Sequence, residues 1–207
     1  MNAALHDAGA FAKAEPKIRA FQLVPSLLPA TIGATHHAEL RRLFDEMFAD
    51  STCSVYLAGA GLHTPARMLM RRVLELGVAV VYLWDLPHEF WAWRDHDNDL
   101  SFSKMLDHLS SAPYRSYLKR DGATKTDDQI IDSNAAERIY GELSDTVHGK
   151  IAEFDVPITD RFEYSATDWK NHLELTVDVA DMLVGLWRKR FPSVEAELEK
   201  RMPQLLR

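Results

Sequence analysis

Apolar residues recur at intervals of three and four over segments of this chain that are too long for strands. The clearest segment begins at Thr64 and Pro65, a hydroxyl that can cap a helix followed by a proline at a favoured first position. Apolar side chains then continue at helical spacing to Trp84, and residues 77–84 are apolar on every side. No alternating pattern elsewhere supplies a partner strand. The sequence therefore predicts an all-α fold, with a deeply buried helix over residues 64–84.

The same reasoning predicts further helices at residues that can cap or open a helix, namely Thr35, Pro87, Ser101, Ser133 and Thr167. The first is expected to end near residue 48, and a separate apolar segment follows over residues 53–62. The helix from Ser133 should run for about 20 residues, and the one from Thr167 should reach about residue 191. Residues 119–132 are polar and are interpreted as a surface connection.

Prolines and composition divide the chain into three parts. Residues 1–34 contain Pro16, Pro25 and Pro29, which predict an irregular N-terminal arm holding at most one short helix. Residues 35–191 are predicted to form a helical bundle with short additional helices. Residues 192–207 are predicted to form a short C-terminal helical tail, in which a new helix begins at Pro192.

The composition is that of a soluble globular protein, with 207 residues, 46% of them hydrophobic and 27% charged. No apolar run approaches the roughly 20 residues needed to cross a bilayer, so no membrane association is expected. Cys53 is the single cysteine, which excludes an internal disulfide and fits a reducing cytoplasm. It is expected to be a small buried residue, because no neighbour in sequence would lower its pKa.

The net charge of −7 argues against unspecific coating of nucleic acid, which depends on neutralising phosphates. It leaves room for a local basic groove. Basic residues cluster at Arg41-Arg42, Arg67, Arg71-Arg72, Arg188-Lys189-Arg190 and Lys200-Arg201. Each cluster also fits an ordinary solvated helix face.

The best candidate for chemistry is His148, which follows Ser144 and Asp145 by about one helical turn. Histidine can act as acid or base near neutral pH, and an ionised Asp145 beside it would favour the imidazolium. The alternative is a histidine packed at the edge of the core and bonded to a carbonyl. Both interpretations are open at the level of spacing.

No metal or cofactor site is predicted. The alternating acids of residues 95–99 resemble the start of a calcium loop. Leu100 stands where that loop needs glycine, and Leu106 where it needs a bidentate glutamate. The histidines lack partners at zinc spacing, and no glycine-rich phosphate loop is present. The dense aromatic segment over residues 82–93 fits either core packing or an interface.

Three short motifs share their order and spacing with one superfamily. They are Arg71-Arg72-Val73-Leu74-Glu75 after an Ala/Gly-rich turn, Phe90-x-x-Trp93 followed by Ser101-Phe102-x-Lys104-Met105-Leu106, and Tyr140-x-x-Leu143-Ser144-x-x-Val147-His148-Gly149. Together they span residues 55–185, about two-thirds of the chain, and resemble HEPN-like proteins. The resemblance implies a helical bundle that forms a homodimer and belongs to a microbial defence or stress system. Active members cleave RNA without metal, using an arginine and a histidine four to six residues apart on one helix.

This chain departs from that pattern at the arginine. The positions that would hold it are Gly141, Glu142 and Leu143. Arg138 is ten residues before His148, about 15 Å along a helix, which is too far to share a phosphate. A cation from another helix is therefore needed.

Two functions follow from the resemblance. In the first, a metal-independent endoribonuclease uses His148 as acid or base, Arg71, Arg72 or Lys150 to hold the phosphate, and Tyr140 to orient the backbone. Glu75 lies one turn from Arg71 and is expected to pair with it. In the second, the chain is a non-catalytic dimeric interaction or regulatory subunit that binds other protein subunits.

Overall fold

The computed structural model describes residues 8–29, 34–96, 98–120, 129–147 and 163–206, and every regular element in these ranges is a helix. The elements are α2 (Ala8–Leu27), α3 (Thr35–Gly59), α4 (His63–Trp84), α5 (Pro87–Asp95), α6 (Phe102–Ser110), α7 (Ala112–Arg120), α8 (Ser133–Val147), α9 (Ala166–Arg190), α10 (Pro192–Arg201) and the short 3-10 helix η2 (Pro203–Leu206). The prediction of an all-α helical bundle is confirmed. None of these described helices is both long and apolar enough to cross a membrane.

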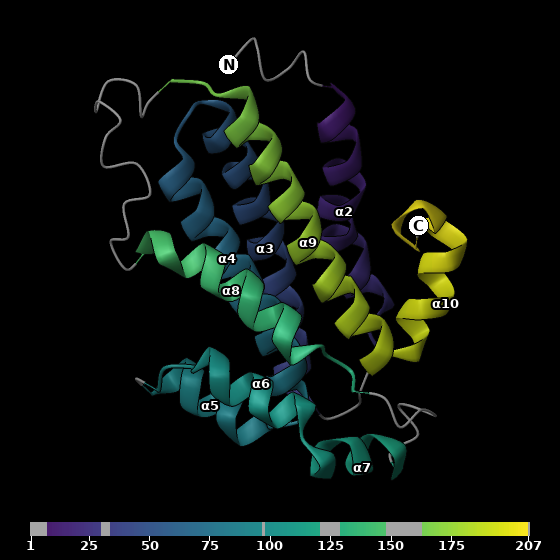
Figure 1. Cartoon of the computed structure of the whole chain (residues 1–207). Helices are drawn as coiled ribbons and strands as arrows, with labels where there is room; N and C mark the ends of the chain where they lie inside the picture. The colour runs from purple at the N-terminus through teal and green to yellow at the C-terminus, as the bar shows by residue number, and fades with distance from the viewer. Residues whose placement is uncertain (1–7, 30–33, 97, 121–128, 148–162, 207) are drawn as a thin grey trace.

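Four long helices, α2, α3, α4 and α9, run side by side along the bundle (Figure 1). Helix α8 crosses this group obliquely and contacts both α4 and α9, whereas α5, α6 and α7 gather at one end. Helix α4 packs against α3, α6, α8 and α9. Residues 77–81 of α4 are therefore buried on all sides. The sequence prediction of a central helix ending at Trp84 is confirmed.

The centre of the core is the fully buried indole of Trp187 on α9. Its ring contacts Phe21 of α2 edge-on, with centroids 5.7 Å apart, and Phe44 of α3 at 4.8 Å. Its Nε1–H donates to the carbonyl oxygen of Gly77 in α4 at 3.1 Å. This one side chain therefore joins the four long helices, and its own buried N–H donor has an acceptor.

Gly77 is required where α4 approaches α9. A Cβ built on Gly77 would lie 2.5 Å from both terminal methyl carbons of Leu183, whereas one built on Gly141 would have no atom within 4 Å. We expect Gly77→Ala to lower the free energy of unfolding by about 1–3 kcal/mol through overpacking. Gly141→Ala, the matched control, should be neutral or stabilising by up to about 1 kcal/mol, because alanine favours helices. Urea unfolding followed by circular dichroism measures both, and equal effects would contradict this account.

The prediction of an irregular arm over residues 1–34 is wrong for Ala8–Leu27, which form helix α2 despite Pro16 and Pro25. The helix buries Ala20, Phe21 and Val24 in the core. Lys17 further ties it to α9 through an ion pair with Asp181. Tertiary packing of an apolar face outweighs the local cost of the two prolines, and composition alone does not reveal that packing.

The predicted break between residues 48 and 53 is also absent, because α3 continues from Thr35 to Gly59. Ser51 donates its hydroxyl hydrogen to the carbonyl of Met47 at 2.7 Å, and Thr52 donates to Phe48 at 2.8 Å. These hydroxyls bond back into the same helix and do not open a new one. Cys53 on this helix is exposed, contrary to the expectation of a buried residue.

Helix starts follow the prediction closely but with shifted caps. Ser101 caps α6 as expected, accepting a hydrogen bond from the Lys104 amide. Asp132 caps α8, accepting from the Ala135 amide at 3.1 Å, and Ser165 caps α9. The predicted polar connection before α8 is wrong at Ile130 and Ile131, which are 2% exposed and belong to the core.

Candidate functional site

The structure brings together two of the residues that the sequence marked for function. Arg71 lies in α4 and Tyr140 in α8, where the two helices cross. The guanidinium Nη2 donates to the phenolic oxygen of Tyr140 at 2.6 Å, and the guanidinium carbon lies 4.8 Å from the ring centre. A cation from α4 is therefore held against the helix whose last described residue, Val147, precedes His148.

The ring of Tyr140 is fixed from its other side by Phe102 of α6. The two rings are stacked, with centroids 4.1 Å apart and planes 8° from parallel. Phe102 is itself 6% exposed and belongs to the core. Tyr140 is thus clamped between an aromatic ring and a guanidinium, which gives its hydroxyl a defined position.

Glu75 completes this cluster by accepting a hydrogen bond from Arg71 Nε at 3.0 Å, as its spacing of four residues predicted. Partial burial works to lower the pKa of Arg71, but the bonds to Glu75 and Tyr140 outweigh it and raise the pKa. The guanidinium therefore stays charged. Within the described residues, two of its five N–H groups are used, which leaves donors for an anion.

Arg72 does not belong to this cluster. It faces α3, where its Nη2 donates to Glu46 at 3.0 Å and its Nη1 donates to Asp50. Adjacent residues on a helix point about 100° apart, which explains why two neighbouring arginines serve different partners. Of the predicted cations, the structure places Arg71 and not Arg72 beside Tyr140.

His148 and Lys150 lie outside the described residues. Ser144 of the histidine motif lies one turn after Tyr140 on α8. Its side chain is buried, and its Oγ has no hydrogen-bond partner among the described residues. Asp145, the next residue, is exposed.

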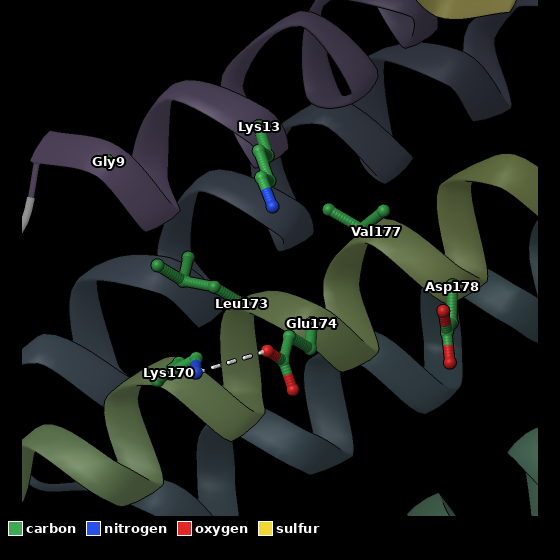
Figure 2. A pocket seen from close by; sticks show the side chains of 7 residues that line it. All are labelled: Gly9, Lys13, Lys170, Leu173, Glu174, Val177 and Asp178. Carbon is green, nitrogen blue, oxygen red and sulfur yellow. Dashed lines mark ion pairs between the residues drawn. The ribbon is translucent and has the colours of Figure 1, made fainter. Parts of the chain in front are cut away.

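A separate groove lies between α2 and α9, and no predicted site residue lines it (Figure 2). Leu173 and Val177 supply its apolar part, and Lys13 projects toward it from α2. Lys170 pairs with Glu174 at 3.8 Å, so much of the rim charge is cancelled. Sequence spacing cannot reveal this groove, because its two helices are far apart in the chain.

The aromatic segment is divided between the core and the surface of the bundle. Trp84 and Phe90 are buried, and the ring of His37 stacks on Trp84 with centroids 3.7 Å apart. Trp91 and Trp93 are only partly buried and pack against the same core. Among the described residues, no three histidine, cysteine or acidic side chains gather as metal ligands would.

Comparison with known family models, curated proteins and solved structures finds no match to this chain.

Proposed function

We propose that this chain is a HEPN-like, metal-independent endoribonuclease of a microbial defence or stress system, acting in the cytoplasm. The observation that carries the proposal is the hydrogen bond between Arg71 and Tyr140. It supplies, from α4, the cation that α8 lacks at residues 141–143. His148 then acts as the acid or base on the same stretch of chain.

RNA cleavage without metal needs a base to take the proton of the 2′-hydroxyl, an acid for the leaving 5′-oxygen, and a cation over the phosphate. Arg71 supplies the cation, because it keeps its charge and has unused donors. Tyr140 holds the guanidinium in position. A homodimer would place two such sets near one RNA strand, which is the arrangement that the family resemblance implies.

The central experiment incubates purified protein with RNA in excess EDTA. We expect the wild-type chain to cut RNA, and His148→Ala to lower the rate by about 10²–10⁴-fold, the usual contribution of a general acid or base. Arg71→Gln should also abolish most activity, whereas Arg72→Gln should not, because Arg72 faces Glu46 and Asp50. Intact RNA with wild-type protein, or equal loss in both arginine variants, would contradict the proposal.

Glu75 offers a second test of the same site. Its carboxylate accepts from Arg71 and competes with a phosphate for that guanidinium. We expect Glu75→Gln to tighten RNA binding several-fold, because a neutral amide holds the guanidinium less strongly than a carboxylate does. Titration of labelled RNA against wild-type and variant protein measures this. Unchanged affinity would indicate that Arg71 is a structural cation only.

A non-catalytic interaction module is the second candidate, and the pairing of both arginines favours it. Glu75 offsets Arg71, Glu46 and Asp50 offset Arg72, and the chain carries a net charge of −7. Such a subunit would form a dimer or bind other protein subunits without cutting RNA. Light scattering after size-exclusion chromatography distinguishes the two: a stable dimer with no cleavage supports the module, and a monomer removes its basis.

A further inference from the structure

Helix α7, Ala112–Arg120, carries three cations and no acidic residue. It buries Tyr114 and Leu118 against the bundle and exposes Tyr117, Lys119 and Arg120. Figure 1 shows α7 at the end of the bundle, below the C-terminal end of α9. In a chain with a net charge of −7, this helix is a local basic surface.

Six cations of the basic clusters noted in the sequence are neutralised, whereas Arg41 and Lys189 donate to backbone carbonyls. Carboxylates pair with Arg42, Arg71, Arg72, Arg188, Arg190 and Arg201. By contrast, Arg115 donates to the backbone carbonyl of Ser110 at 3.0 Å, which carries no net charge. Neither Arg115 nor Arg120 pairs with a carboxylate in the described part of the chain. Their charges therefore remain available to an anionic partner.

Tyr117 places an aromatic ring among these cations. Its ring is stacked on that of Tyr114, with centroids 5.9 Å apart, and its hydroxyl donates to Asp85 Oδ1 at 3.3 Å. Asp85 is held in turn by Arg190 and Tyr114. The side chain of Tyr117 is nevertheless 43% exposed. It is thus an ordered aromatic surface one helical turn from Arg120.

We propose that α7 is a binding surface for single-stranded RNA, with an unpaired base stacked on Tyr117 and phosphates bound by Arg115 and Arg120. An exposed ring among cations is what recognition of single strands requires, because bases of a duplex have no free face. This inference rests on the proposed function for its choice of RNA. The surface itself is separate from the Arg71–Tyr140 cluster on α4 and α8.

The test measures binding and not cleavage, using a labelled single-stranded deoxyoligonucleotide that lacks the 2′-hydroxyl and cannot be cut. We expect Arg115→Gln/Arg120→Gln to weaken binding and to reduce the slope of log affinity against log salt by about 1.4, since each phosphate contact contributes about 0.7. Tyr117→Leu should weaken binding about tenfold, and Tyr117→Phe should bind nearly as wild type does. Both Tyr117 variants lose the bond to Asp85, so their difference isolates the aromatic ring.

The matched control is Arg42→Gln/Arg201→Gln, which removes the same charge from two exposed helical arginines that already pair with carboxylates. The inference would be overturned if this control weakened binding equally, or if Tyr117→Leu bound as wild type does. Tighter binding of a duplex, or preferential binding of anionic lipid vesicles, would also overturn it. If the α7 variants lose binding while wild-type protein fails to cut RNA, the surface stands and the proposed ribonuclease falls. If wild-type protein cuts RNA and the α7 variants bind and cut equally well, the surface falls alone.

Discussion

Arg190→Met should lower the free energy of unfolding by about 3–5 kcal/mol, the cost of removing one partner from a buried ion pair. Arg190 on α9 and Asp85 after α4 have side chains that are only 8% and 7% exposed. The pair is bidentate, with Nε 2.9 Å from Oδ2 and Nη2 2.5 Å from Oδ1. Methionine fills similar space without charge, so Asp85 would be left with its tyrosine donors but no cation. Urea unfolding at neutral pH measures the change.

The neighbouring Arg188 provides a matched control for this prediction. It pairs with Glu195 nearer the surface, where the two side chains are 27% and 39% exposed. Arg188→Met should therefore cost about 1 kcal/mol or less. The double variant Asp85→Asn/Arg190→Met should recover part of the loss, because it removes the unpaired charge. A cost for Arg190→Met no larger than that of Arg188→Met would show that Asp85 does not depend on its cation.

The Asp85 network explains how the short helices are attached to the bundle. Tyr114 of α7 donates to Asp85 Oδ2 at 2.7 Å, and Arg190 reaches the same carboxylate from the end of α9. One carboxylate thus joins the ends of α4 and α9 to α7. The loss expected for Arg190→Met should therefore also loosen α7, the helix proposed to bind RNA.

The helices could be predicted from the sequence where local signals agreed with packing. Residues 64–84 begin with Thr64-Pro65 and keep unbroken helical spacing, and α4 occupies nearly that range. The predicted threonine cap is wrong, because α4 begins at His63 and no side chain caps it. Residues 8–27 carry prolines that indicate a break, yet α2 forms because Phe21 and Val24 are buried between neighbouring helices. That burial depends on α3 and α9, which no local pattern encodes.

In the candidate site too, contacts within one helix could be predicted from the sequence, and contacts between helices could not. The pairing of Arg71 with Glu75 was predictable, because residues four apart on a helix are neighbours. The bond from Arg71 to Tyr140 joins residues 69 positions apart and depends on the angle at which α8 crosses α4. The sequence marked both residues as candidates, but only the fold brings them into contact. Likewise, the sequence does not show that Arg72 and Arg190 pair with carboxylates, because those carboxylates lie far away in the chain.

The second large effect concerns pH, and it centres on His172 of α9, which is 2% exposed. Its Nε2 lies 2.9 Å from Ser54 Oγ, and that hydroxyl donates its only hydrogen to the Ala66 carbonyl at 2.7 Å. Nε2 must therefore carry a hydrogen and donate to Ser54, which leaves a lone pair on Nδ1. In the part of the chain that the structure describes, this buried Nδ1 has no hydrogen-bond partner. Protonation would place a charge there without an acceptor.

Burial, with smaller contributions from His63 and Arg67, lowers the pKa of His172 from 6.5 to about 4. The unfolded chain therefore binds a proton at higher pH than the folded chain does, so stability is complete above about pH 6.5 and falls as the pH drops toward 4. The full loss is on the order of 3 kcal/mol, because each tenfold difference in proton affinity between the folded and unfolded chain is worth about 1.4 kcal/mol. Burial also lowers the pKa of His37 and His108, which adds loss of the same sign.

His172→Gln separates this residue from the rest of the chain, because glutamine can place its Nε2–H donor near the position of the histidine Nε2 but does not titrate in this range. We expect urea unfolding at about pH 7 and about pH 4.5 to show a smaller loss of stability for the variant than for wild type. His88→Gln, which changes a histidine whose side chain is 74% exposed, should lose stability as wild type does. Equal losses in wild type and His172→Gln would mean that the imidazole finds an acceptor when protonated. In that case the junction of α3, α4 and α9 would contain a polar partner for Nδ1, such as a bound water.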